Sequence, residues 1–107
     1  MHLQEKKWTL AEREFRAVID LDPTSLFARA YLGNIYYLIG KFNLARDNYK
    51  EILKVSPRDA GIKKNLALTY IKLGKKEEAI KEFNEVLEIN PDDEAVKLEL
   101  SRLKGQR

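Results

Sequence analysis

The three prolines of this chain stand at one constant interval. They are Pro23, Pro57 and Pro91, so that 34 residues separate each from the next. A period of this length indicates a repeat array, in which each unit buries its apolar face against its neighbours. Further series keep the residue type at the same interval: Ala11, Ala45 and Ala79; Phe15, Tyr49 and Phe83; Ile19, Leu53 and Leu87; Leu21, Val55 and Ile89.

Each period contains two helical patterns separated by a glycine. Apolar residues three and four positions apart predict a first helix with one buried face, and the same spacing predicts a second helix after Gly40. Glycine accepts the left-handed conformation that ends many helices, so Gly40 and Gly74 are expected to end theirs. The predicted buried residues are Ala28, Leu32, Ile35, Tyr36 and Ile39 in the first helix, and Ala45, Tyr49, Ile52 and Leu53 in the second.

The sequence therefore predicts an all-α fold. We expect helices over residues 9–21, 25–39, 42–55, 59–73, 76–89 and 92–104, with short connections that make successive helices antiparallel. Asp22, Ser56 and Asn90 each precede a proline. We expect them to be N-caps, with the proline as the first helical residue. Acidic residues that follow, such as Asp59, suit the positive end of the helix dipole.

Composition limits the classes of function. The 107 residues include 44% hydrophobic and 35% charged residues, which is typical of a folded domain, and the apolar runs are too short to span a membrane. There is no cysteine, and the formal net charge is only +3. The first residues lack the apolar core of a secretory signal, so we expect a cytoplasmic location.

At this point the chain resembles the tetratricopeptide repeat (TPR) family. One unit has Leu32-Gly33, Tyr36, Gly40, Ala45, Tyr49 and Pro57, and the next has Leu66-Ala67, Tyr70, Gly74, Ala79, Phe83 and Pro91. An incomplete unit with Ala11, Phe15 and Pro23 precedes them. Arg29 and Lys63 replace the family's frequent tryptophan, and Lys6 stands where the first turn glycine would be. The resemblance gives one domain: an incomplete repeat at 1–25, repeats at 26–59 and 60–93, and a capping helix and tail at 94–107.

The resemblance implies an α-solenoid of antiparallel helix pairs, wound as a right-handed superhelix, whose first helices line a concave groove. In this family such a groove usually holds a segment of another protein, so the chain is expected to be a protein-protein interaction scaffold. Exposed apolar strips support this expectation. The residues predicted to face the groove are Phe27, Tyr31, Asn34, Tyr37, Lys64, Asn65, Leu68, Leu98 and Arg102, while Val96, Leu100 and Leu103 of the last helix are expected to pack inward.

One subclass of the family binds carboxylate ends of chaperone tails through a lysine, two asparagines, a lysine and an arginine. Asn34 and Asn65 match the asparagines. Ala30, Ala95 and Glu99 occupy the three cationic places, so capture of a terminal carboxylate is not expected.

Other functions find little support in the residues. His2 is the only histidine, so no metal site, no cofactor and no catalytic centre is expected. Lys63, Lys64, Lys72, Lys75 and Lys76 leave open an alternative, a helical repeat that binds nucleic acid weakly, although nearby glutamates dilute their charge.

The N-terminal edge lacks the first helix of its unit. We therefore expect an apolar edge that is covered either by more of a longer repeat protein or by a second copy of the chain, most simply in a two-fold dimer. The residues predicted to form this self-association edge are Trp8, Ala11, Phe15 and Val18.

Overall fold

The computed structural model describes the backbone of residues 2–105 and the side chains of residues 7–105. Within this part the chain forms six α-helices and no strand, which confirms the predicted fold class. The helices are α1 (His2–Leu21), α2 (Leu26–Leu38), α3 (Phe42–Val55), α4 (Ala60–Lys72), α5 (Lys76–Ile89) and α6 (Glu94–Gly105).

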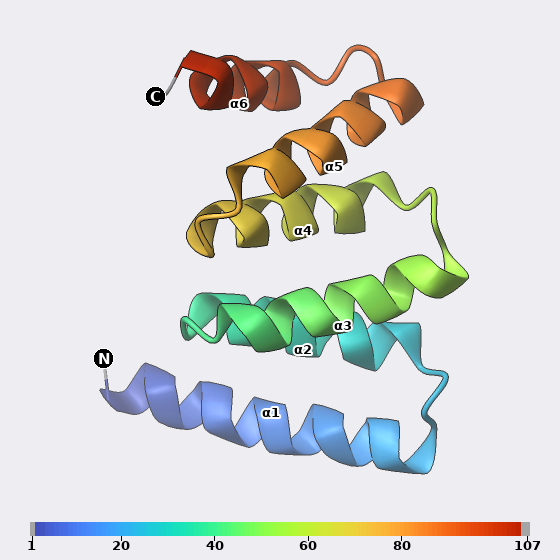
Figure 1. Ribbon diagram of the computed structural model, residues 1–107. Helices are drawn as coiled ribbons and strands as arrows, with labels where there is room; N and C mark the ends of the chain where they lie inside the picture. Colours follow the sequence, from blue (N-terminus) through green and yellow to red (C-terminus); the bar gives the residue numbers. More distant parts are fainter. Residues whose placement is uncertain (1, 106–107) are drawn as a thin grey trace.

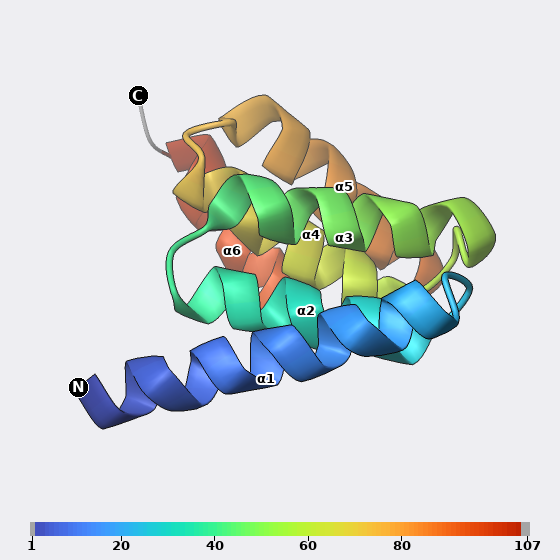
Figure 2. The same cartoon turned by 90° about the horizontal axis from the view of Figure 1, so that it is seen from below.

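The helices form an elongated stack of antiparallel neighbours. Figure 1 shows α1 at one end of the stack and α6 at the other, with the pairs α2 and α3, and α4 and α5, between them. The molecule measures 40 × 32 × 20 Å. The view from below in Figure 2 shows α1 lying across α2. Each helix therefore finds its main packing partner next to it in the chain, as expected for a solenoid.

The glycine turns have the predicted conformation. Gly40 and Gly74 have φ angles of 83° and 74°, in the left-handed region. After α2, the Lys41 N–H donates to the Tyr36 carbonyl at 2.8 Å and the Gly40 N–H to the Tyr37 carbonyl at 3.2 Å. These two bonds make a Schellman motif, which pairs the last carbonyls of α2 before the chain turns into α3.

The proline turns differ from the prediction. The N–H of Ser25 donates to the carbonyl of Asp22 at 3.1 Å, so Pro23 occupies the second position of a β-turn and not the first turn of a helix. The true N-caps of α2 and α4 are Ser25 and Asp59. The side chain of each accepts a hydrogen bond from the backbone N–H of the residue three positions later. The predicted caps at Asp22, Ser56 and Asn90 were therefore wrong. Asp93 repeats the arrangement by accepting from the Val96 N–H at 3.2 Å.

The first helix is longer than predicted. A helix was expected to begin at residue 9, but α1 runs without interruption from His2 to Leu21. Gly40 and Gly74 reverse the chain in the later units, whereas this unit has Lys6 at the equivalent place. A lysine carries a Cβ that disfavours the left-handed conformation, so the helix continues through this position.

The core follows the predicted buried faces. Ala28, Leu32, Ile35 and Tyr36 are buried in α2, Ala45, Tyr49 and Ile52 in α3, and Val96, Leu100 and Leu103 in α6. The inward packing predicted for the last helix is therefore confirmed. The predicted Ile39 and Leu53 are only partly buried, although both pack against the core cluster.

Candidate functional site

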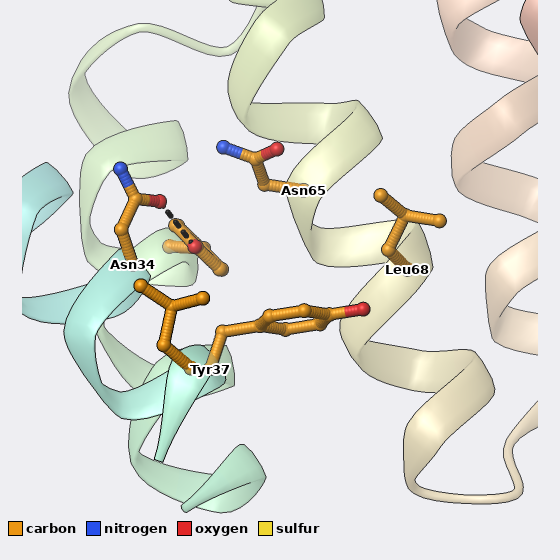
Figure 3. A pocket seen from close by; sticks show the side chains of 6 residues that line it. Asn34, Tyr37, Asn65 and Leu68 are labelled. Carbon is orange, nitrogen blue, oxygen red and sulfur yellow. Dashed lines mark hydrogen bonds between the residues drawn. The ribbon is translucent and has the colours of Figure 1, made fainter. Parts of the chain in front are cut away.

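A cavity of about 260 Å³ opens between the first helices of the two complete units. Its lining comes from α2, α3 and α4: Asn34, Tyr37, Leu38, Tyr49, Asn65 and Leu68. Figure 3 shows Asn34 and Tyr37 on one side and Asn65 on the other, all pointing into the space between α2 and α4. The wall thus combines two side-chain amides with aromatic and aliphatic groups. Such a combination suits a ligand with both apolar and hydrogen-bonding parts.

The buried side chain of Tyr49 lines the cavity and makes a hydrogen bond to one of the two amides in its wall. The Tyr49 hydroxyl donates to Oδ1 of Asn34 at 2.6 Å, drawn as the dashed line in Figure 3. This bond satisfies the hydroxyl of a side chain that is only 2% exposed. It also fixes the Asn34 amide, whose Nδ2 remains a donor for a ligand.

Gly33 explains how Tyr49 of α3 can reach the cavity. A Cβ built on Gly33 would lie 2.6 Å from Cε1 of Tyr49. Because no side chain stands between the α2 backbone and the ring, α2 and α3 approach closely and the hydroxyl extends past Gly33 to Asn34. The glycine is therefore required by close packing here, and not by its φ angle.

Four of the nine residues predicted for the groove line this cavity: Asn34, Tyr37, Asn65 and Leu68. Phe27 and Tyr31 instead join Phe15 of α1 in a partly exposed aromatic cluster outside the cavity. The Phe15 ring stacks on Tyr31 with centroids 4.9 Å apart, and the Phe27 and Tyr31 centroids are 4.5 Å apart. The structure therefore splits the predicted strip of aromatic residues into two parts.

The remaining predicted groove residues lie outside the cavity. Nζ of Lys64 pairs with Asp93, the N-cap of α6, at 2.9 Å, and Arg102 pairs with Glu99 at 3.3 Å. Leu98 is 54% exposed. The neighbouring Lys63 is largely buried and pairs with glutamates of α5. Ion pairs therefore already occupy Lys63 and Lys64, two of the lysines that suggested a nucleic-acid surface.

Sequence reasoning missed Leu38 and Tyr49 as cavity residues. Tyr49 was assigned to the buried face, which is correct, but its hydroxyl was a usable signal. The equivalent residues Phe15 and Phe83 have no hydroxyl, and a buried phenol requires a polar partner. For Leu38 no comparable signal exists, because one exposed leucine on a helix is common.

The predicted self-association edge is partly covered within the chain. Trp8, Ala11 and Phe15 are half-buried, whereas Val18 is exposed. The cover over Phe15 comes from Phe27 and Tyr31 of α2. Self-association through this edge stays a prediction.

We expect alkaline unfolding of the domain between about pH 10 and pH 12. Burial, followed by the charge of Tyr37, raises the pKa of Tyr49 to about 12. Burial, followed by the hydrogen bond to Glu12, raises the pKa of Tyr36 to about 12 as well. Since an unfolded tyrosine titrates near ~10, the stability that these groups provide is complete below that pH and is lost as the pH rises through the folded values.

The measurement follows phenolate absorbance and helical circular dichroism together while the pH is raised. Part of the phenolate signal should appear only with the loss of helix, and Tyr49→Phe should make stability depend less steeply on pH. All tyrosines ionising near their ordinary pKa with the helices intact would contradict the assignment.

No group of three or more His, Cys, Asp or Glu side chains in the described part of the chain could hold a metal ion. None of its helices has the length and apolar content needed to cross a membrane.

Comparison with known proteins decides the family. The family model described as Tetratricopeptide repeat matches residues 40–103, which is more than half of the chain. The chain belongs to the tetratricopeptide repeat family. The match begins at the turn glycine Gly40 and ends in α6, so it includes α3, α4 and α5 completely. No curated protein matches this TPR chain.

Solved structures share the fold of this TPR domain over nearly its whole length. The first TPR domain of Spaghetti (RPAP3), bound to an HSP90 peptide, is 20% identical, with a TM-score of 0.85 over 96% of this chain and 82% of that one. The Arabidopsis OM64 TPR domain is 15% identical, with a TM-score of 0.85 over 98% and 87%. MamA from Desulfovibrio magneticus is 20% identical, with a TM-score of 0.85 over 94% of this chain and 57% of that one.

Proposed function

We propose that this TPR domain is a protein-interaction module that binds a peptide segment of a partner in the cavity between α2 and α4. The observation that carries the proposal is the cavity itself, where two amides stand among apolar side chains. Family membership and the fold shared with a TPR domain bound to a peptide support it.

The lining indicates how a peptide would be held. Nδ2 of Asn34 and the amide of Asn65 can pair with the ligand backbone. Tyr37, Leu38 and Leu68 offer apolar area for one side chain of the ligand, and Tyr37 loses little conformational entropy because it has few rotatable bonds. The best ligand is therefore a segment with an apolar anchor residue.

This groove lacks the positive charges that a site for a terminal carboxylate would need. The places where the carboxylate-binding subclass has cations hold Ala30, Ala95 and Glu99. Glu99 forms an ion pair with Arg102, and its negative charge offsets the positive charge of that arginine. We therefore propose an internal peptide segment as the ligand, in contrast to a terminal carboxylate.

The test uses peptides selected from a random library on the wild-type domain. Tyr37→Ala and Leu68→Ala are expected to weaken binding of the selected peptides by ~1–3 kcal/mol each, because each removes apolar contact area inside the cavity. Tyr31→Ala, in the aromatic cluster outside the cavity, should weaken binding by less. Calorimetric titration measures the affinity, and circular dichroism confirms that each variant is folded.

A matched control is Leu21→Ala, at an 89% exposed position on the far end of α1. It removes a similar side chain and should leave affinity unchanged. Selected peptides that bind Tyr37→Ala and Leu68→Ala as tightly as the wild type would place the binding surface elsewhere.

A further inference from the structure

The two ends of the stack carry complementary halves of a repeat. Helices α2 and α4 are the first helices of their units, and α3 and α5 are the second helices. By the 34-residue period, α1 corresponds to α3 and α5, and α6 corresponds to α2 and α4. Figure 1 shows α1 and α6 at opposite ends of the stack. One end therefore presents a second helix, and the other a first helix.

The α1 face that is equivalent to a buried face in α3 and α5 is incompletely covered. Val18 is 41% exposed, whereas its equivalents Ile52 and Val86 are 2% and 0% exposed. Ala11 is also partly exposed, while both of its equivalents, Ala45 and Ala79, are fully buried. In the complete units this face packs against the first helix of the same unit, as the approach of Tyr49 to Gly33 shows.

The matching face of α6 is open in the same way. In α2 the contact with α3 uses Gly33, which is buried, and its equivalent Ala67 in α4 is buried too. The equivalent in α6 is Ser101, which is small and exposed. A small residue at this position lets an aromatic ring of a second helix approach the backbone. Phe15 of α1 is the ring at the corresponding place.

Charged residues at equivalent repeat positions also match between the two ends of the stack. Within α4 and α5, Lys63 pairs with Glu82 at 3.6 Å although both side chains are only 12% exposed. Their equivalents are Lys97 in α6 and Glu14 in α1, both exposed. Lys97 makes an ion pair at 3.5 Å with Glu94 of its own helix, a surface pair of small energy. A lysine at this position is thus compatible with helix pairing, and opposite charges stand where two copies would meet.

We propose that copies of this chain associate head to tail, with α6 of one copy packed on the Ala11, Phe15 and Val18 face of α1 in the next. The contact repeats the packing of α2 on α3 and completes a repeat between two chains. It is heterologous, so it extends into an open superhelical chain and does not close as a two-fold dimer. Because α6 contributes polar residues, the contact is weak, depends on concentration and is weakened by salt.

The experiment uses two variants, each blocking one end. Val18→Glu places a charge on the α1 face at an exposed position. Ser101→Trp fills the space at the small residue of α6. In sedimentation velocity from micromolar to millimolar concentration, wild-type chains should grow beyond a dimer, and each variant alone should stay monomeric. An equimolar mixture should form a dimer and nothing larger, since one functional α1 face and one functional α6 face remain.

The alternatives give different patterns. In a two-fold dimer through α1, Ser101→Trp would self-associate like the wild type, and that result would overturn the proposal. So would a wild-type chain that stays monomeric at millimolar concentration.

A charge pair checks the register. Glu14→Lys and Lys97→Glu should each weaken association by at least about tenfold, which corresponds to ~1.4 kcal/mol, and their mixture should recover part of the loss at low salt. The matched control Asp20→Lys is the same charge reversal at an exposed position on the opposite side of α1, and it should leave association unchanged. Loss of association in Asp20→Lys equal to that in Glu14→Lys would contradict the proposed register.

Discussion

Phe83→Ala is expected to lower the free energy of unfolding by ~3–5 kcal/mol, whereas Phe15→Ala should cost less than half of that. The two residues hold the same position in their units, but Phe83 is 2% exposed and Phe15 is half-buried. Removing a fully buried ring loses its transfer free energy and leaves a cavity, whereas a ring at an open edge leaves a surface that water can refill. Urea denaturation of both variants at one pH measures the difference.

This comparison tests whether the two ends of the stack differ from its middle. Chemistry, helix position and repeat position are the same for both substitutions, so that burial is the main variable. The measurement belongs at protein concentrations where the wild type is monomeric, because association would add cover to Phe15. Equal losses for the two variants would mean that Phe15 is covered as fully as Phe83, against the structure.

Gly33→Ala is expected to destabilise the domain by ~1–2 kcal/mol, although alanine is the better helix former. The added Cβ would lie 2.6 Å from Cε1 of Tyr49, whose ring is buried and hydrogen-bonded to Asn34. Overpacking of this kind costs ~1–3 kcal/mol, and the gain in helix propensity offsets up to ~1 kcal/mol of it. The ring must move, so the variant should also distort the cavity and weaken peptide binding.

Two variants isolate the cause. Gly61→Ala is the matched control, since it lies at an exposed position in α4 where the nearest contact of a Cβ is an ordinary 3.5 Å to Oδ1 of Asp59. It should leave stability unchanged or raise it. Combined with Tyr49→Leu, Gly33→Ala should lose most of its own cost, which a double-mutant cycle measures. A stabilised Gly33→Ala single variant would show that α2 and α3 are not in close contact at this point.

The sequence predicted the middle of the fold better than its ends. Helices expected at 42–55 and 76–89 have those bounds in α3 and α5, because a glycine turn before them and a proline turn after them limit the helix on both sides. At the N-terminus no such signal exists: Lys6 replaces the glycine, and α1 continues through residues 2–8. The caps were misplaced because a proline suits a β-turn as well as a first helical turn.

The candidate site was predictable in part, for a comparable reason. Asn34, Tyr37, Asn65 and Leu68 could be placed from helical phase together with the groove that the TPR resemblance implies, since α2 and α4 are regular helices that both line the cavity. Phe27 and Tyr31 were predicted to face the same groove, but their rings pack against Phe15 of α1. Helical phase describes one helix at a time and does not predict such a contact between two helices. The reach of Tyr49 past Gly33 likewise depends on the distance between helices.

The most direct test of peptide binding between α2 and α4 is amide chemical-shift mapping of the labelled wild-type domain during titration with a selected peptide. The largest changes should come from the backbone and side-chain amides of Asn34 and Asn65 and from the amides around Tyr37 and Leu68, which line the cavity. Residues on the outer side of α3 and α5, such as Lys50 and Lys81, should change little. Large changes confined to that outer side, with the amides of Asn34 and Asn65 unmoved, would contradict the account.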